Sequence, residues 1–356
     1  MEIKNLKKFF LTKKNSEILI IAGKKSYNKI SGEKLLRKNL SKDTKVHYYF
    51  KNSKNPELSE LKIIVEKIKK IQPSLIIAIG GGCAMDYAKS ANVLALEKNM
   101  NFKKEFSESF CNLLCIPTTA GTGSETTPFA VLYVNNKKTS VVGPALKADF
   151  FYFEPKFIKY NNNYTIASAG FDSLSQSMES ILSKNANINS IRFAKKSIKL
   201  VLSNLIKFYK KKKEINAKNL LYAANYSGKA ISISKTGVAH ALSYPFSSHF
   251  NLSHGHSVSL NTLNAIKFNY LNQNKSKILK KRLEILLKCF DCKDYNQFEK
   301  KISLIFKRLN LEQNFKRLNI SETKLIKLKK FINEDRLRNN IIKLNEKDID
   351  NILFKR

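Results

Sequence analysis

Residues 74–96 read SLIIAIGGGCAMDYAKSANVLAL, which is an apolar strand, three glycines and a helix in immediate succession. Glycines in this place let the backbone approach a pyrophosphate, and the free N–H groups that open the helix bind its charge. A tight turn without a ligand is the alternative interpretation of three glycines after a strand. The order of strand, glycines and helix predicts an α/β unit.

Further apolar runs on both sides of this stretch predict the rest of a sheet. Strands are expected at residues 17–22, 45–50, 74–79 and 112–116, and a helix is expected at residues 59–71. Helical spacing of the apolar residues supports that helix. Alternation of strand and helix indicates parallel strands joined by crossover helices.

The chain changes character after a hairpin-like segment that is expected at residues 129–133 and turns at Asn135 and Asn136. Long stretches of helical period then cover residues 166–182, 189–209, 217–233 and most of 257–356. Pro155 and the asparagines at 161–163 mark the change. We therefore expect an α/β nucleotide-binding domain with a parallel sheet over residues 1–160, followed by an all-α domain over residues 161–356.

Composition limits the class of protein. The chain has 356 residues, of which 43% are hydrophobic, and this share is enough for proper cores and excludes a disordered chain. No apolar run approaches the ~20 residues of a membrane helix. We therefore expect neither a membrane partner nor a signal peptide, and we expect a cytoplasmic protein. The net charge is +37, but only eight of the 65 basic residues are the arginines that phosphate recognition favours. We therefore expect no nucleic-acid partner.

A second loop, PTTAGTGSE at residues 117–125, follows the strand expected at residues 112–116. Its hydroxyl side chains can donate hydrogen bonds to phosphate and ribose oxygens. Two such loops at neighbouring strand ends form a nucleotide cleft. The pair of loops is therefore stronger support for nucleotide binding than either loop alone.

Histidine usage indicates a metal or catalytic site, because four of the five histidines lie close together in the sequence. They are His240, His249, His254 and His256. Upstream, Asp172 and Gln176 are one helical turn apart, and a carboxylate from one helix with imidazoles from others commonly holds a divalent metal. His249 lies in a Ser-Ser-His-Phe loop and is expected to face solvent.

Together these motifs resemble the iron-containing (group III) alcohol dehydrogenases of the dehydroquinate-synthase-like superfamily. GGGCAMDYAK at residues 80–89 resembles the family's GGGSxxDxAK, and the loop at residues 117–125 matches its PTTAGTGSE. GFDSLSQ at residues 170–176 resembles its GxDAxxH, while HALSYP at 240–245 and SHG at 253–255 resemble its HxxxHP and PHG. RLRNN at residues 336–340 and DIDNIL at residues 348–353 resemble its C-terminal helix. The combination is similar to the phosphonoacetaldehyde-reductase branch.

The resemblance implies a dehydroquinate synthase-like fold and one divalent metal, Fe²⁺ or Zn²⁺. The implied ligands are Asp172, Gln176, His240 and His254. Gln176 stands where the family has a third histidine, and its amide oxygen is a poorer donor to a transition metal. We therefore expect weaker metal binding than with three imidazoles.

The resemblance also implies a nicotinamide cofactor. The expected contacts are Gly23, Ser26, Gly81, Gly82, Asp86, Thr118, Thr119, Thr122 and Lys138. NAD-preferring members of the family often carry Asp at the position of Gly23, whereas Lys24 and Lys25 follow here. A 2′-phosphate would meet cations there, so NADP(H) is favoured over NAD(H).

The implied activity is hydride transfer between NAD(P)H and a small aldehyde or alcohol, with Tyr244 or His256 as the proton donor to the alkoxide. Lys229 and Lys235 are expected to bind an anionic tail, as in the phosphonoacetaldehyde/2-hydroxyethylphosphonate pair of phosphonate metabolism, unless both face solvent. We expect a homodimer. The alternatives are a lyase or cyclase of the dehydroquinate-synthase kind and a basic, non-enzymatic nucleic-acid-binding protein.

Overall fold

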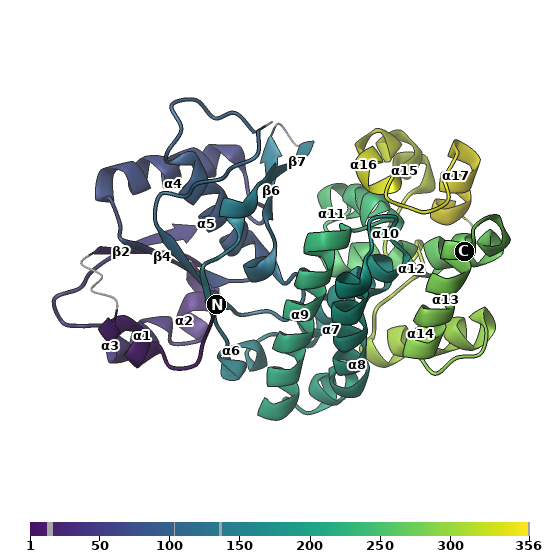
Figure 1. Cartoon of the computed structure of the whole chain (residues 1–356), viewed down its shortest axis with the longest axis horizontal. Coiled ribbons are helices and arrows are strands. Elements are labelled where there is room, and N and C mark those ends of the chain that lie inside the picture. Colours follow the sequence, from purple (N-terminus) through teal and green to yellow (C-terminus); the bar gives the residue numbers. More distant parts are fainter. Residues whose placement is uncertain (13–16, 103, 135–136, 355–356) are drawn as a thin grey trace. The chain divides into compact units, whose positions relative to one another are not determined.

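The structure is a computed structural model that describes residues 1–12, 17–102, 104–134 and 137–354. The chain divides into two compact units, Met1–Asn161 and Asn162–Arg356. Figure 1 traces both units along the chain, and each is described by itself here.

Six strands among the described residues of the first unit form one parallel sheet, in the order β1-β8-β5-β4-β2-β3. They are Glu2–Ile3 (β1), Glu17–Gly23 (β2), Lys45–Lys51 (β3), Leu75–Gly80 (β4), Asn112–Pro117 (β5) and Phe150–Tyr152 (β8). The four predicted strands lie where the sequence placed them, and the α/β class is confirmed. β1 and β8 were not predicted, because runs of two and three residues show no periodicity.

Helices cover both faces of this sheet, which is why the central strands β2, β4 and β5 are mostly apolar instead of alternating. Leu19 and Ile21 pack on one side with Leu61 and Met85, and Ile18 packs on the other. The elements are α1 (Leu6–Thr12), α2 (Lys24–Lys29), α3 (Gly32–Asn39), α4 (Leu58–Ile71), α5 (Gly82–Leu94) and α6 (Pro155–Lys159), with short 3₁₀ turns η1 (Ser124–Thr126) and η2 (Pro144–Leu146).

A separate antiparallel hairpin is formed by β6 (Phe129–Val134) and β7 (Lys137–Val142), as the sequence predicted. The expected turn at Asn135 and Asn136 lies outside the described residues. The hairpin carries Lys138, one of the expected cofactor contacts. Lys138 lies on β7, opposite Tyr133 of β6.

The described part of the second unit consists of helices, which confirms the all-α prediction. They are α7 (Asn163–Leu182), α8 (Ile188–Lys210), α9 (Glu214–Ser234), α10 (Val238–Leu242), α11 (Tyr244–His249), α12 (His254–Leu271), α13 (Lys277–Cys289), α14 (Tyr295–Leu309), α15 (Glu322–Leu328), α16 (Glu334–Leu337) and α17 (Glu346–Phe354), with 3₁₀ turns η3 (Gln273–Lys275) and η4 (Lys329–Phe331).

Helix α7 is the centre of this unit, surrounded by α8, α9 and α12 (Figure 1). Every residue from 170 to 182 is buried. Small side chains allow the close approach: a Cβ added at Gly170 would lie 2.3 Å from Cδ1 of Leu205 on α8. Buried serines find partners on neighbouring helices, as Ser175 does with Thr262 at 2.6 Å. A polar sequence can therefore form a core helix here.

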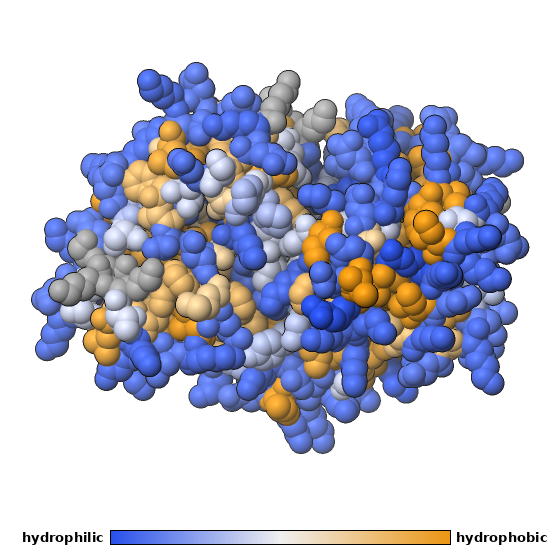
Figure 2. Space-filling model, in the orientation of Figure 1, coloured by the Kyte–Doolittle hydropathy of each residue, from blue (hydrophilic) through white to orange (hydrophobic). Residues whose placement is uncertain are grey.

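The face shown in Figure 2 is mostly hydrophilic, with scattered hydrophobic residues between the charged ones. In the part of the chain that the structure describes, no helix combines the length and the apolar character needed to cross a membrane.

Candidate metal centre and nucleotide loops

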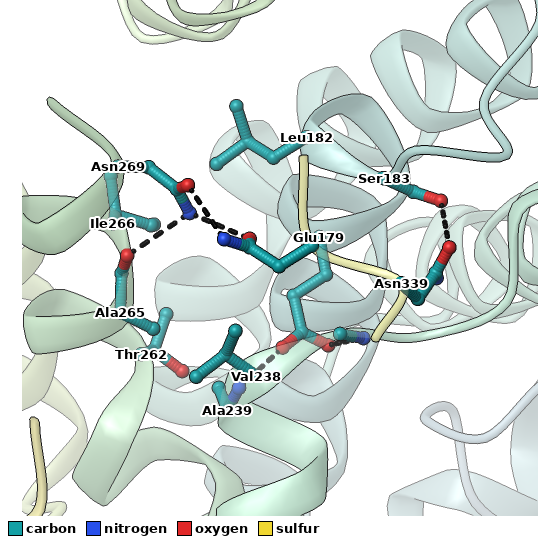
Figure 3. A pocket seen from close by; sticks show the side chains of 12 residues that line it. Glu179, Leu182, Ser183, Val238, Ala239, Thr262, Ala265, Ile266, Asn269 and Asn339 are labelled. Atoms are coloured by element: carbon teal, nitrogen blue, oxygen red, sulfur yellow. Dashed lines mark hydrogen bonds between the residues drawn. The ribbon is translucent and has the colours of Figure 1, made fainter. Parts of the chain in front are cut away.

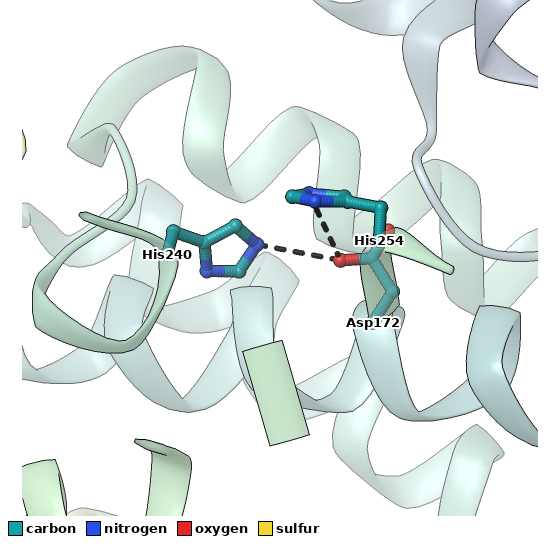
Figure 4. Close-up of side chains that lie close together, drawn as sticks. All are labelled: Asp172, His240 and His254. Atoms are coloured by element: carbon teal, nitrogen blue, oxygen red, sulfur yellow. Dashed lines mark hydrogen bonds and ion pairs between the residues drawn. The ribbon is translucent and has the colours of Figure 1, made fainter. Parts of the chain in front are cut away.

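Three side chains of the second unit converge on one point (Figure 4). Asp172, His240 and His254 each offer a ligand atom, and these atoms all lie within 4.8 Å of one another. Oδ1 of Asp172 is 3.3 Å from Nε2 of His240 and 3.8 Å from Nε2 of His254. The Asp172 and His240 side chains are buried, whereas that of His254 is 34% exposed, so the cluster is accessible from the side of His254.

Three different helices deliver these side chains. Asp172 lies in the middle of α7, His240 lies in the short helix α10, and His254 is the first residue of α12. Gly255 explains how α12 comes so close to α7: a Cβ added there would lie 2.0 Å from the carbonyl oxygen of Ser168 and 2.9 Å from Cβ of Asp172. Only glycine permits this approach, which places His254 beside Asp172.

Glu179 holds the segment that carries His240. Its carboxylate accepts hydrogen bonds from the N–H groups of Gly237, Ala239 and His240 at 3.0, 2.6 and 3.2 Å, and from Nδ1 of His240 at 2.5 Å. It lies beside a cavity of about 20 Å³ (Figure 3). Glu179 was not predicted from the sequence, although its place seven residues after Asp172, on the same face of α7, was a usable signal.

The hydrogen bond to Glu179 decides which nitrogen of His240 is available. Because Nδ1 donates, Nε2 of the neutral ring has a lone pair, and this lone pair faces an acceptor, Oδ1 of Asp172. Burial lowers the pKa of His240, but the carboxylates of Glu179 and Asp172 outweigh it, and the pKa is raised. The buried site therefore favours a cation between these atoms.

The donor set also fits a metal ion. Two imidazole nitrogens and one carboxylate oxygen are ligands that suit Zn²⁺ and Fe²⁺, and a carboxylate behind the ligating imidazole is the usual support for such a ligand. Asp172, His240 and His254 could therefore hold a divalent metal, with Glu179 as the orienting group.

Gln176, the expected fourth ligand, takes part in a hydrogen-bond chain. Its Nε2 donates to Oδ2 of Asp172 at 3.2 Å, and its Oε1 accepts from Oγ of Ser227 at 2.9 Å. In this orientation the amide fixes the carboxylate of Asp172. Its use as a metal ligand stays a prediction.

Asn339, in the RLRNN motif, ties the end of α9 to the end of α7 (Figure 3). Its Nδ2 donates to the carbonyl oxygens of Ser234 and Thr236, each at 2.8 Å, and its Oδ1 accepts from Ser183 at 2.9 Å. These bonds fix the start of the segment that leads to His240.

We expect Asn339→Ala to lower the free energy of unfolding by about 2–4 kcal/mol, because it breaks several hydrogen bonds and takes the side-chain donor from the carbonyl oxygen of the buried Thr236. Urea denaturation of both proteins would measure the loss. The exposed Asn189→Ala serves as the control and should change stability by no more than about 0.5 kcal/mol. A loss below 1 kcal/mol for Asn339→Ala would contradict this role.

Both ring nitrogens of His256 are engaged within the protein. Nε2 lies 2.7 Å from the carbonyl oxygen of Glu312, to which it donates, and Nδ1 accepts from the Tyr164 hydroxyl at 3.1 Å. Burial lowers the pKa of His256. Its backbone N–H donates to Oγ of Ser168 on α7. The structure therefore favours a positioning role for His256, at the start of α12, over the expected role of proton donor.

Tyr244 and His249 are the first and last residues of α11, the helix that follows α10 with His240. Tyr244 is 5% exposed, and burial raises its pKa. The guanidinium carbon of Arg336 lies 5.4 Å from the Tyr244 ring. Its role as proton donor stays a prediction. His249 is half-buried rather than fully solvated: its ring lies 5.0 Å from that of Phe331, outside the metal cluster.

The structure does not bring Lys235 close to the ligand cluster. Lys235 follows Ser234, whose carbonyl oxygen accepts a hydrogen bond from Ser183, just beyond the end of α7. Ser183 is eleven residues beyond Asp172, which is about 16 Å along a helix axis. The Lys235 side chain is exposed. The alternative, in which this lysine faces solvent, fits the structure better.

The Lys229 side chain lies against aromatic rings of α8 and α9, whereas the expected metal ligands lie on α7, α10 and α12. Its ammonium lies 6.0 Å from the ring centre of Phe193 and 5.6 Å from that of Tyr226, which stack between α8 and α9. This is a cation–π contact. The structure thus does not bring Lys229 and Lys235 together with Asp172, His240 and His254.

In the first unit, the two predicted nucleotide loops lie side by side. Gly80 of β4 is registered with Pro117 of β5, and the N–H of Thr118 donates to the carbonyl oxygen of Gly80 at 2.9 Å. A Cβ added at Gly81 would lie 3.0 Å from Oγ1 of Thr119, and one at Gly82 would lie 3.0 Å from Cγ2 of Thr122. The glycines thus make room for the second loop. They also place no side chain beyond hydrogen at the start of α5, as a phosphate site requires.

Asp86 and Lys89 hold the second loop against α5. Oδ1 of Asp86 accepts from Oγ of Ser124 at 2.8 Å, and Nζ of Lys89 donates to the Ser124 carbonyl and to Oγ1 of Thr127, each at 2.9 Å. Burial lowers the pKa of Lys89 to about 8. Burial raises the pKa of Asp86, and the charges of Lys89 and Lys138 oppose it. We therefore assign Lys89 and Asp86 to the support of the loop.

Gly23 ends β2 at the neighbouring place in the sheet. Oγ of Ser26 donates to its carbonyl oxygen at 2.9 Å, and Lys24 and Lys25 are exposed. The sequence analysis missed a further cation: Lys51 of β3 is registered with Gly23, and its Cε lies 3.9 Å from a Cβ built there. Only the pairing of β2 with β3 brings Lys51 to this position.

Comparison with known proteins agrees with this architecture. A family model described as iron-containing alcohol dehydrogenase matches residues 2–155, and one described as the C-terminal part of the Fe-containing alcohol dehydrogenase family matches residues 166–356. A solved structure of sulfoacetaldehyde reductase from Bifidobacterium kashiwanohense, in complex with NAD⁺, has the same fold, with a TM-score of 0.87 and 23% identity over 98% of this chain and 93% of that chain.

Two curated relatives show how far the similarity extends. Aldehyde-alcohol dehydrogenase 2 of Entamoeba histolytica is 28% identical over 276 residues, which are 72% of this chain and 32% of that protein. Phosphonoacetaldehyde reductase of Streptomyces viridochromogenes is 28% identical over 221 residues, which are 58% of this chain and 56% of that protein. The chain thus spans less than two thirds of the length of these relatives.

Proposed function

Since this chain belongs to the iron-containing alcohol dehydrogenase family, we propose that it is an oxidoreductase that transfers a hydride between a nicotinamide cofactor and a small aldehyde or alcohol. The observation that carries the proposal is the convergence of Asp172, His240 and His254, whose ligand atoms lie within 4.8 Å of one another. The nucleotide loops of the first unit support the same activity.

Each residue of the cluster has a separate task. A divalent metal, Fe²⁺ or Zn²⁺, held by Asp172, His240 and His254 would supply Lewis-acid polarisation of the carbonyl oxygen. Glu179 keeps the proton of His240 on Nδ1, so that Nε2 faces the site. Gln176 holds the outer oxygen of Asp172 in place. Tyr244 is the proposed proton donor to the product alkoxide, through water where the distance requires it.

For the substrate we propose a short aldehyde, with phosphonoacetaldehyde among the candidates. Its support is the relative that is named a phosphonoacetaldehyde reductase. Lys229 and Lys235 have no part in this proposal, because they lie apart from the ligand cluster.

The test is reduction of propionaldehyde and of phosphonoacetaldehyde by NADPH and NADH, followed at 340 nm with the metal-free protein before and after addition of Fe²⁺ or Zn²⁺. We expect metal-dependent net oxidation of the cofactor, which also separates a dehydrogenase from a cyclase that returns its NAD unchanged. Absence of net oxidation with every metal and aldehyde would overturn the proposal. A ratio of kcat/KM near one for the two aldehydes would remove phosphonoacetaldehyde as the preferred substrate.

We propose NADPH as the preferred cofactor, because Lys24, Lys25 and Lys51 surround Gly23 and no acidic side chain stands at that position. Gly23 has ordinary extended angles, with φ of −86° and ψ of 123°, and a Cβ added there would lie 3.2 Å from Oγ of Ser26, so a side chain fits once that hydroxyl shifts slightly. We expect Gly23→Asp to weaken NADPH binding about 10- to 100-fold by charge repulsion, and to leave NADH binding nearly unchanged.

Isothermal titration of each cofactor would measure this change. Asn28→Asp adds the same charge at an exposed place on α2 and is the matched control. A wild-type protein that binds NADH tenfold more tightly than NADPH would refute the preference.

Gln176→His should tighten metal binding, because imidazole is a better donor to Fe²⁺ and Zn²⁺ than an amide oxygen. We expect a gain of about tenfold or more, measured by competition with a chelator of known affinity. Ser227→Ala is the control, since it removes the hydrogen bond to Oε1 of Gln176, along with those to Ala224 and Ser173, and leaves every expected ligand in place. An unchanged metal affinity in Gln176→His would show that this position is outside the ligand set.

A further inference from the structure

We propose that the helical unit has a second binding site, for a small carboxylate with an apolar tail of about six carbons, in a cavity between α8 and α14. The cavity measures about 160 Å³. Its walls are aliphatic, with Val201 and Leu205 from α8, Leu304 from α14 and Leu174 from α7. A cavity of about 150 Å³ with such a lining holds one benzene molecule, so this one accommodates a ring or chain of six carbons.

The cations on α14 select for a negative head group. Lys301 and Arg308 line the cavity together with Leu304, and their spacing of three and four residues puts all three on one face of α14. Nζ of Lys301 already donates to the carbonyl oxygen of Phe290 at 2.5 Å and lies 3.8 Å from Oδ2 of Asp291, so Arg308 is the cation that remains for a ligand. Arg308 makes no hydrogen bond or ion pair with any residue that the structure describes, and no acidic side chain lines the cavity. Its planar guanidinium matches a carboxylate in a bidentate contact.

This cavity is separate from the metal cluster. Leu174 is two residues after Asp172 on α7, which is more than half a turn around the helix, so the two side chains point to different sides. The ligand would therefore bind without displacing a substrate. It would contact α7 through Leu174, on a different side of the helix from Asp172.

The experiment is a titration of the metal-loaded protein, without nicotinamide cofactor and in 0.15 M salt, with hexanoate and with its neutral counterpart hexanamide. We expect hexanoate to bind with a Kd below about 1 mM and about tenfold or more tightly than hexanamide. Arg308→Gln should bring hexanoate to the level of hexanamide. Lys307→Gln, the exposed neighbour that does not line the cavity, is the matched control and should change nothing.

Filling the cavity separates this site from binding at the metal. Leu202→Trp replaces a partly exposed lining residue and Leu304→Trp an exposed one. Each should remove hexanoate binding while kcat/KM for the aldehyde stays within about twofold. That unchanged activity also shows that the variants are folded. Hexanoate binding that survives Arg308→Gln and both tryptophan variants would overturn the proposal, as would a wild-type Kd above 10 mM.

Discussion

His254→Ala is expected to lose bound metal and aldehyde reduction together, while the helical unit stays folded. The cluster that the structure describes has two imidazoles and one carboxylate, so removal of His254 leaves one imidazole, His240, and the carboxylate of Asp172. A Lewis acid supplies several kcal/mol of transition-state stabilisation, and a loss of ~4 kcal/mol is about a 10³-fold fall in kcat/KM. Metal content by elemental analysis and kcat/KM for propionaldehyde would measure the two losses.

The fold should tolerate this change, because the His254 side chain is 34% exposed and stands at the first position of α12. We expect the free energy of unfolding of the metal-free protein to change by less than about 1 kcal/mol. His249→Ala is the matched control: His249 hydrogen-bonds to Ser248 and lies outside the cluster, so metal and activity should be kept. Stoichiometric metal in purified His254→Ala would show that the assignment of His254 is wrong.

Glu179→Gln is the second change with a large expected effect, although Glu179 touches neither substrate nor metal. Glutamine has the same size, but one of its two polar atoms is an amide donor. All four hydrogen bonds of Glu179 are accepted from N–H groups, including Nδ1 of His240. The amide N–H of the glutamine would therefore face one of these N–H groups. Alternatively, the proton of His240 would move from Nδ1 to Nε2, where it occupies the lone pair that faces Asp172.

We expect Glu179→Gln to weaken metal binding about 10- to 100-fold, as loss of an orienting carboxylate commonly does. Chelator competition would measure this affinity, and saturating metal should restore much of kcat, which separates positioning from catalysis. Glu214→Gln at the exposed start of α9 is the control. If Glu179→Gln binds metal as tightly as the wild type, the carboxylate does not orient His240.

The elements that the sequence predicted well are those with a strong local signal. The strands at 17–22, 74–79 and 112–116 are mostly apolar runs, the strand at 45–50 is rich in aromatic and β-branched residues, and each was placed to within about a residue. Helix α7 was harder, because its buried residues include five serines and a glycine between 168 and 180. Its helical period was still readable, but the depth of its burial depends on partners such as Thr262 on α12.

The candidate site divides in the same way. The motif resemblance indicated Asp172, His240 and His254, and the structure brings them together. Glu179 was missed because its role depends on backbone N–H groups at residues 237–240. Lys235 is five residues from His240 in the sequence, yet it follows Ser234, which pairs with Ser183 just beyond the end of α7.

The sequence by itself determined the parallel α/β unit, the helical unit and the types of residue at each site, since hydrophobic period, turn residues and short motifs act over one or two turns of chain. Only the tertiary structure decided which nitrogen of His240 faces Asp172, that Lys51 stands beside Gly23, and that the exposed Arg308 lines an apolar cavity. These features depend on strand register and on helices that cross at glycines, and such contacts join residues that are far apart in the sequence. No local pattern specifies them, because each side of the contact is set by a different part of the chain.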